Sequence, residues 1–234
     1  MITAETPVRD IAVQVPNTIP VFEELRIDYC CGGQHTLAEA CAKINLSVDS
    51  VLDQLRQEEQ DTQEDIWESA PLAELVDHIV LNHHAFTREQ LGLIQNLAAK
   101  VERRHGSVHP EIVSLNAAIA ALASELISHT GCEEGILFPY IKHLEKSGDP
   151  APSPVFGNIK HPVSHMMSDH DKTGDELQKI RAITNDYQAP TDACTTFQAF
   201  YRALEDLETD LHRHIHLENN ILFPRAIALA HEQP

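Results

Sequence analysis

Several residue classes are scarce in this chain, and each shortage excludes a class of protein. Aromatic residues make up only 5% of the 234 residues and there are only 9 glycines, while Leu, Ala, Glu and Gln are common, which favours helix over sheet. Lys and Arg number 17 against 36 Asp and Glu, so the formal net charge is -19 and the basic footprint of a nucleic-acid or membrane-surface protein is missing. The composition predicts an all-α protein with no nucleic-acid or membrane partner.

Long apolar segments and a regular cysteine framework are missing as well. No run of about 18 apolar residues occurs, and the N-terminus has no charged-then-apolar signal, so we expect a cytoplasmic protein. The five cysteines are an odd number at irregular spacing, which a secreted disulfide framework would not use. We therefore expect reduced thiols.

One eleven-residue phrase occurs twice. Residues 129–139 and 214–224 both read H-x3-E-x2-I-L-F-P. A histidine and a carboxylate four residues apart lie on one face of a helix, so both side chains can reach one metal centre. We interpret the Ile-Leu-Phe-Pro that follows as core packing and then a helix stop.

The repeat extends upstream of each phrase. His84 and His170 each have Thr three residues later and Leu seven residues later, and they precede the histidines of the two phrases by 45 and 44 residues. This pattern indicates two helical hairpins of common descent, each with one His on its first helix and a His and a Glu on its second. The predicted metal ligands are His84, His129, Glu133, His170, His214 and Glu218.

The positions of the turns test this interpretation. Residues on antiparallel helices lie at the same height only when the turn is midway between them. The midpoints between successive ligand histidines fall at 106–107, at 149–150 and at 192, each inside a cluster of helix-breaking residues. An up-down-up-down four-helix bundle would therefore hold every predicted ligand at one level.

A strongly acidic segment divides the chain. Residues 58–70 carry six acids and no base, and Pro71 then suits the first turn of a new helix. We predict a small helical N-terminal domain over 1–57, an acidic linker over 58–70 and the four-helix bundle over 71–234.

Short helices are expected in the N-terminal domain. The pattern predicts them over 8–14 and near 17–25, after Thr36, where Thr36 and Glu39 form a capping box, and after Ser47.

Several polar residues near the repeat point away from the ligand face of a regular helix. We expect them to flank the metal site, with His83 in solvent; they are His83, Glu134, His212 and His216.

Two further histidines are alternatives that the ligand set leaves out. His105 is 21 residues from His84, about 30 Å along a continuous helix, so it cannot join the same cluster. His165 competes with His170 for the third helix, but only His170 fits both the repeat and the turn positions.

Two carboxylates among imidazoles inside a helical bundle are typical of a non-haem di-iron centre. Mixed His and carboxylate ligands suit iron or manganese, whereas structural zinc more often uses four ligands that include Cys. Two irons that share both glutamates, with two His each and an oxo or hydroxo bridge, would each keep one open position for O2, NO or peroxide. Ordinary surface His and Glu residues at helical spacing are the alternative.

The segment Asp28-Tyr-Cys30-Cys31-Gly32-Gly33 is a second candidate site. The two glycines permit positive φ, so we expect both thiols on a tight, accessible turn that reaches the mouth of the metal centre. Two small buried residues at a helix end are the alternative.

Taken together, these motifs resemble the family of iron-sulfur cluster repair di-iron proteins (RIC, YtfE/ScdA type). The resemblance covers nearly the whole chain, with D-Y-C-C-G-G marking a ScdA-type N-terminal domain and the two repeated phrases marking a hemerythrin-like bundle. It implies cytoplasmic stress proteins that help restore iron-sulfur clusters damaged by oxidative or nitrosative stress, with an oxo-bridged di-iron centre on the six predicted ligands. The middle loop, with D-P-A-P-S-P, is longer than we expect for the family.

Three functions are compatible with these features. The first is a repair protein that donates iron or handles NO at damaged clusters, assisted by Cys30 and Cys31 through thiolate ligation or redox exchange. The second is a hemerythrin-like O2 or NO carrier or sensor, and the third is an enzyme that reduces NO or peroxide. The expected partners are damaged iron-sulfur proteins and these small ligands, and a homodimer is compatible with the chain.

Overall fold

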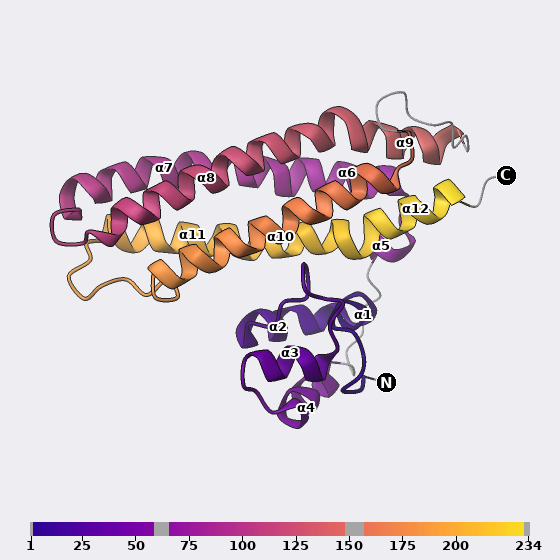
Figure 1. Cartoon of the computed structure of the whole chain (residues 1–234), viewed down its shortest axis with the longest axis horizontal. Coiled ribbons are helices and arrows are strands. Elements are labelled where there is room, and N and C mark those ends of the chain that lie inside the picture. The colour runs from indigo at the N-terminus through magenta and orange to yellow at the C-terminus, as the bar shows by residue number, and fades with distance from the viewer. Residues whose placement is uncertain (1, 59–65, 148–156, 232–234) are drawn as a thin grey trace. The chain divides into compact units, whose positions relative to one another are not determined.

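The structure, a computed structural model, describes residues 2–58, 66–147 and 157–231. The described residues form helices and turns and contain no strand, and Pro7 and Thr36 form an isolated bridge (Figure 1). The all-α prediction is therefore confirmed. The predicted turn at 149–150, the long middle loop and most of the linker 58–70 lie outside the described residues.

All four predicted N-terminal helices are present. They are α1 (Val8–Gln14), α2 (Ile19–Leu25, after a 3-10 turn at Pro16–Thr18), α3 (Leu37–Lys43) and α4 (Val48–Glu58). The capping box before α3 is also confirmed. Thr36 Oγ1 accepts a hydrogen bond from the Glu39 N–H at 3.2 Å, and the Glu39 carboxylate accepts one from the Thr36 N–H at 2.9 Å.

The longer helices follow in the second part of the chain. They are α5 (Ile66–Ser69), α6 (Leu72–His78), α7 (Ala85–His105), α8 (Glu111–Cys132), α9 (Phe138–Ser147), α10 (Lys160–Ile183), α11 (Thr195–His216) and α12 (Phe223–His231). The turns predicted at 106–107 and at 192 fall between helices, which is what the midpoint argument requires. The helix α6 begins where the Glu145 carboxylate accepts hydrogen bonds from the N–H groups of Leu72 and Ala73.

Three π-helical segments interrupt these helices. They are η3 (Ile79–His84), η4 (Glu133–Leu137) and η5 (Leu217–Leu222), and each joins two α-helices without a break. The predicted helix stop at Pro139 and Pro224 is wrong, because α9 and α12 continue through these prolines. Proline lacks an N–H and crowds the carbonyl four residues earlier, and a wider turn just before it accommodates both effects.

The chain forms two compact units, each built from segments that are distant in sequence. Unit 2 comprises Asp77–Tyr140 and Ser164–Leu211, and its helices α7, α8, α10 and α11 run side by side around one apolar core (Figure 1). Each helix contributes buried side chains, among them Leu91, Ile94, Leu115, Leu122, Leu177, Ile180, Phe200 and Leu204. This arrangement is the predicted four-helix bundle; the predicted domain boundaries stay predictions.

Unit 1 comprises Met1–Val76, Ile141–Val163 and His212–Pro234. Its core gathers around Phe22, Leu37 and Leu55 of the N-terminal helices, and Ile215 from the end of α11 packs into the same cluster. The N-terminal helices of unit 1 therefore share a core with the part of α11 that carries the second repeated phrase.

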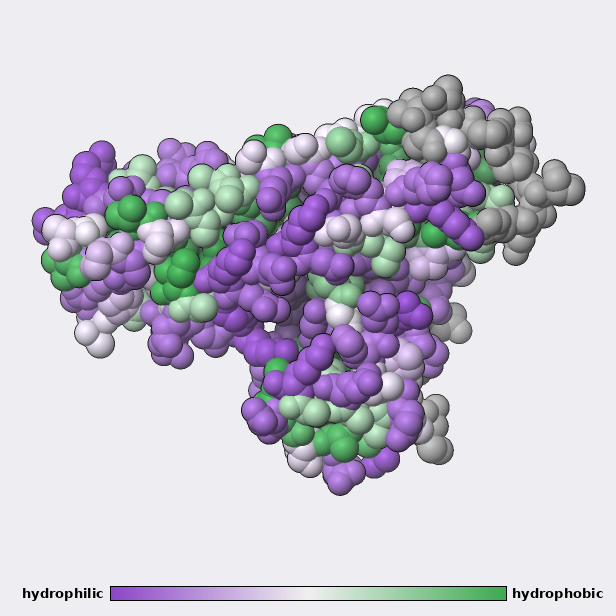
Figure 2. Space-filling model, viewed as in Figure 1, coloured by the Kyte–Doolittle hydropathy of each residue, from purple (hydrophilic) through white to green (hydrophobic). Residues whose placement is uncertain are grey.

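The visible surface is predominantly hydrophilic, with hydrophobic residues in separate patches (Figure 2). Among the described residues one helical stretch, Glu111–Ser147, is long and apolar enough to cross a membrane by length and composition. Core helices of soluble proteins pass the same test, so one such stretch is weak evidence for a membrane span.

Candidate metal centre

Glu133 lies among three imidazoles. Its carboxylate is fully buried, with Oε2 3.4 Å from Nε2 of His84 and Oε1 3.2 Å from Nε2 of His129. Nε2 of His129 is also 2.9 Å from Nε2 of His170. The segment η3 supplies His84, while α8 and α10 supply the other two histidines. Residues far apart in the sequence thus bring their nitrogen atoms to one carboxylate.

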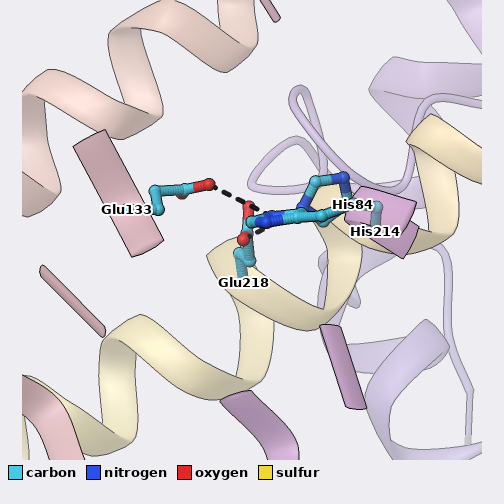
Figure 3. A group of neighbouring side chains, drawn as sticks. All are labelled: His84, Glu133, His214 and Glu218. Atoms are coloured by element: carbon cyan, nitrogen blue, oxygen red, sulfur yellow. Dashed lines mark hydrogen bonds and ion pairs between the residues drawn. The ribbon is translucent and has the colours of Figure 1, made fainter. Parts of the chain in front are cut away.

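His214 and Glu218 form a similar pair on α11 and η5. Nε2 of His214 is 3.0 Å from Oε1 of Glu218, and both side chains are almost fully buried. The donor atoms fall into two groups, each within 4.8 Å, and Figure 3 shows the polar ends of the first group facing one another. The first group is His84, Glu133, His214 and Glu218, and the second is His129, Glu133, His170 and Glu218.

These residues fit a bound cation. Donor atoms held on perpendicular bonds of about 2.1 Å to one ion lie about 3 Å apart, and the four distances given above, 2.9 to 3.4 Å, are of this size. Buried carboxylates are costly unless they are paired or coordinate a metal. Neutral imidazole and carboxylate together suit iron or manganese better than a structural zinc ion.

Glu134 orients one of the histidines. Its Oε1 is 2.8 Å from Nδ1 of His84 and 2.7 Å from Nη1 of Arg88. Burial raises the pKa of Glu134, but the hydrogen bonds from Arg88 and His84 outweigh this effect, so the pKa lies below its ordinary value. A carboxylate at Nδ1 fixes the ring and directs Nε2 toward the metal site, as in many metalloproteins.

The expectation that His83 lies in solvent is wrong, whereas Glu134 flanks the site as expected. His83 is only 8% exposed, and its Nδ1 is 2.9 Å from Oδ1 of Asp210. Asp210 belongs to α11, so His83 is covered by a neighbouring helix, which angles counted within one helix cannot predict.

His165 lies in a surface cavity beside the site. Its side chain is 69% exposed, and its Nδ1 is 3.0 Å from Oδ2 of Asp169, which is 3.8 Å from Nδ1 of His129. The cavity has a volume of about 370 Å³, and Ser128, Cys132 and Thr173 also line it. His170 therefore faces the carboxylate site, whereas His165 lies on an approach to His129.

The cysteine segment forms a tight turn around Asp28. Oδ1 of Asp28 accepts hydrogen bonds from the N–H groups of Cys30 at 3.1 Å and Cys31 at 2.9 Å, and the two sulfur atoms are 3.6 Å apart. Cys30 is buried and Cys31 is half-buried, so the expected accessibility is wrong for Cys30. The hydrogen bond with Cys31, together with burial, raises the pKa of Cys30 well above its ordinary value.

The role of the glycines also differs from the prediction. Neither Gly32 nor Gly33 has a positive φ. Gly33 is required by close approach instead, because a Cβ at this position would lie 2.6 Å from the Tyr29 carbonyl oxygen and 2.8 Å from Cβ of Arg9.

Two asparagines attach the cysteine turn to the metal-bearing segment η5. The side-chain amide of Asn219 donates to the Cys30 carbonyl at 3.1 Å, and that of Asn220 donates to the Tyr29 carbonyl at 3.0 Å. Both asparagines follow Glu218 directly. Sequence reasoning missed this contact, because its partners are about 190 residues apart.

The predicted flanking histidines of α11 contact α2 and the cysteine turn that follows it. Nδ1 of His212 is 3.1 Å from Glu23 Oε1, which also accepts a hydrogen bond from the Tyr29 hydroxyl at 2.8 Å. The His216 ring lies 5.4 Å from that of Tyr29, and burial lowers the pKa of His216 to about 4. His216 is therefore neutral near pH 7.

Comparison with known proteins identifies the family of the chain. Residues 75–226 match the hemerythrin HHE cation binding domain, and residues 4–59 match ScdA_N, a domain of unknown function (DUF542). The iron-sulfur cluster repair proteins YtfE of Escherichia coli O81 (strain ED1a) and of Escherichia fergusonii are each 40% identical to the chain over 224 residues, which cover 96% of this chain and 97% of the relative. The chain therefore belongs to the family of the iron-sulfur cluster repair protein YtfE, with an ScdA_N segment followed by a hemerythrin HHE cation-binding segment.

Proposed function

We propose that this protein repairs damaged iron-sulfur clusters by means of two iron ions that share Glu133 and Glu218. The overlap of the two donor groups supports this count, because each group contains both carboxylates and a different pair of histidines. The relatives named iron-sulfur cluster repair protein YtfE support the role. The partners in this role are iron-sulfur proteins of the cytoplasm damaged by oxidative or nitrosative stress.

Different residues of the chain have different roles in binding the metal. Each of the two glutamates belongs to both donor groups, and the four histidines supply neutral nitrogen ligands. Glu134 fixes the ring of His84, and the cavity beside His129 gives small molecules such as NO, O2 or peroxide a route to the site. When bound, iron supplies redox chemistry and a coordination position for these ligands.

The observation that carries the repair role is the attachment of the cysteine turn to η5. The amide of Asn219, the residue after Glu218, holds the main chain of Cys30, so the thiol pair is anchored to the segment that bears a proposed ligand. Asp28, Cys30 and Cys31 place their donor atoms within 4.8 Å of one another. Soft thiolates beside a carboxylate would form a transient site for iron that leaves the centre, at the cost of deprotonating Cys30.

Variants that separate metal binding from repair test this proposal. A Cys30→Ser, Cys31→Ser double variant should retain two irons per chain but lose the ability to reactivate an NO-damaged iron-sulfur enzyme. Cys194→Ser, which changes an exposed cysteine that belongs neither to this turn nor to the donor groups or the cavity beside them, is the matched control and should retain both properties. Full reactivation by the double variant would reduce the pair to a structural turn, and one iron per chain or zinc at full occupancy would contradict the centre itself.

Exposure of the reduced protein to NO distinguishes iron donation from NO reduction. Iron donation predicts that iron is released without a stoichiometric amount of N2O, and that the cysteine double variant releases it more slowly. N2O production with full iron retention would show instead that the protein is an NO reductase.

A further inference from the structure

A second thiol site lies at the turn between α7 and α8, away from the metal centre. His105 is the last residue of α7, and its Nε2 is 3.2 Å from Sγ of Cys194, which immediately precedes α11. His105 is 21 residues beyond His84 along the same helical stretch, about 30 Å along its axis. The pair therefore belongs to neither group of metal donors.

The start of α11 stabilises a negative charge on the sulfur of Cys194. The Cys194 carbonyl accepts hydrogen bonds from the N–H groups of Phe197 and Gln198, which places this cysteine at the first turn of the helix. Main-chain N–H groups there, first that of Phe197 and then that of Thr196, lower the pKa of the Cys194 thiol below its ordinary value. A helix N-terminus is a recognised setting for thiolates.

The imidazole beside the sulfur is held in place by an aromatic ring. Phe197 is fully buried, and its ring centroid lies 5.3 Å from that of His105 and 5.5 Å from that of His109. His109 in turn contacts Asp192 and Glu111, and hydrogen bonds to these two carboxylates raise its pKa. These contacts bring two imidazoles and two carboxylates to this end of the bundle, contributed by α7, α8 and the segments before α8 and α11.

We propose that Cys194 is a reactive thiol that forms mixed disulfides with small neutral or cationic disulfides, with His105 as its proton acceptor. The exposed sulfur attacks one sulfur atom of the small disulfide, a new S–S bond forms to Cys194, and the other half leaves as a thiolate. His105 takes the proton of the Cys194 thiol, and the departing thiolate recovers it. The reaction needs no oxidant besides the small disulfide.

The neighbouring charges define which disulfides react. Asp192 and Glu111 lie on the histidine side of the site, and the chain as a whole has a formal net charge of -19. A dianionic disulfide such as glutathione disulfide is repelled by this field, whereas a dicationic one such as cystamine is attracted.

The chain contains its own control. Cys132 is exposed like Cys194, but it is the last residue of α8 and continues directly into η4, so it is not at a helix N-terminus. Both cysteines are therefore exposed, but Cys194 alone of the two lies at the start of a helix and has an imidazole nitrogen 3.2 Å from its sulfur.

The test treats the full-length, metal-loaded protein with cystamine at pH 7 and quantifies mixed disulfides on Cys194 and Cys132 by peptide mass spectrometry. Cys194 should react faster by roughly threefold or more, since the larger thiolate fraction outweighs the lower nucleophilicity of each thiolate. Cystamine should also react faster than glutathione disulfide at Cys194. Equal rates at the two cysteines would overturn the proposal.

Two substitutions of the histidine separate its chemical role from a structural one. His105→Gln and His105→Phe should each slow the Cys194 reaction and shift the pH midpoint of its alkylation upward, while the Cys132 reaction stays unchanged. An unchanged reaction rate and an unchanged pH midpoint in both variants would show that His105 does not accept the proton of Cys194. Iron content and cluster repair should be unaffected in these variants, so failure here leaves the proposed repair function untouched.

Discussion

The carboxylate of Glu134 offers a sharp test of how the metal centre is built. Glu134→Ala removes the hydrogen-bond partner of His84 Nδ1, at 2.8 Å, without touching a proposed ligand. Loss of such an outer partner typically weakens metal binding by about 10- to 100-fold, which corresponds to about 1.4 to 2.8 kcal/mol. Because His84 belongs to only one of the two donor groups, the loss should fall mainly on one iron.

The assay is competition with a chelator at pH 7, followed by absorbance and by metal analysis. We expect biphasic iron loss in Glu134→Ala, with one iron removed at a lower chelator concentration, and a smaller effect in Glu134→Gln, which retains an acceptor. Glu89→Ala, an exposed glutamate on α7, makes the same change of charge and should behave as the unmodified protein. Monophasic loss, or equal weakening in Glu89→Ala, would refute the orienting role of Glu134.

Three further predictions concern other parts of the molecule. Glu133→Leu should remove most of the bound iron, measured by metal analysis, because this carboxylate belongs to both donor groups. Burial raises the pKa of Glu23, but hydrogen bonds involving His212 and Tyr29 lower this pKa below its ordinary value of 4.5. The contribution of Glu23 to stability is therefore present above pH 4.5 and is lost as the pH falls further. Amide exchange in the cysteine turn should accelerate below pH 4.5, and an unchanged exchange rate would contradict this prediction. Gly33→Ala should lower the free energy of unfolding by about 1–3 kcal/mol, because the new Cβ would lie 2.6 Å from a backbone atom. Gly92→Ala, whose Cβ would have nothing within 4 Å, should instead stabilise α7 by about 0.5–1 kcal/mol.

Local sequence signals predicted most of the secondary structure and the fold class. The capping box of Thr36 and Glu39, the breaker clusters and the repeated phrases act over a few residues or at a fixed period, so a single chain displays them directly. The same signals named six candidate ligands, and the structure brings their donor atoms into two compact groups.

Contacts between distant residues and departures from regular helix geometry could not be predicted in this way. The Asn219 amide on the Cys30 carbonyl joins residues 189 positions apart, and His105 and Cys194 are 89 positions apart, so neither pair has a periodic signal. The burial of His83 and the contact of Glu134 with His84 have the same cause, since Asp210 is 127 positions from His83 and Glu134 is 50 positions from His84.

The π-helical segments also determine where this chain can tolerate a change of length. A π turn holds one residue more than the α turn it replaces, so deleting one residue from η4 or η5 would restore a regular helix and leave the residues beyond it facing nearly the same direction. Deleting one residue from the α-helix before the segment would instead rotate everything beyond it by about 100°. Phe138 and Phe223, which directly follow these segments and are at most 2% exposed, would keep their buried positions in the first case and turn away from them in the second. The π-helical segments are therefore the places along these helices where the loss of one residue leaves the phase of the helix relative to the core unchanged, whereas the length of the α-helix before each segment is expected to be constrained.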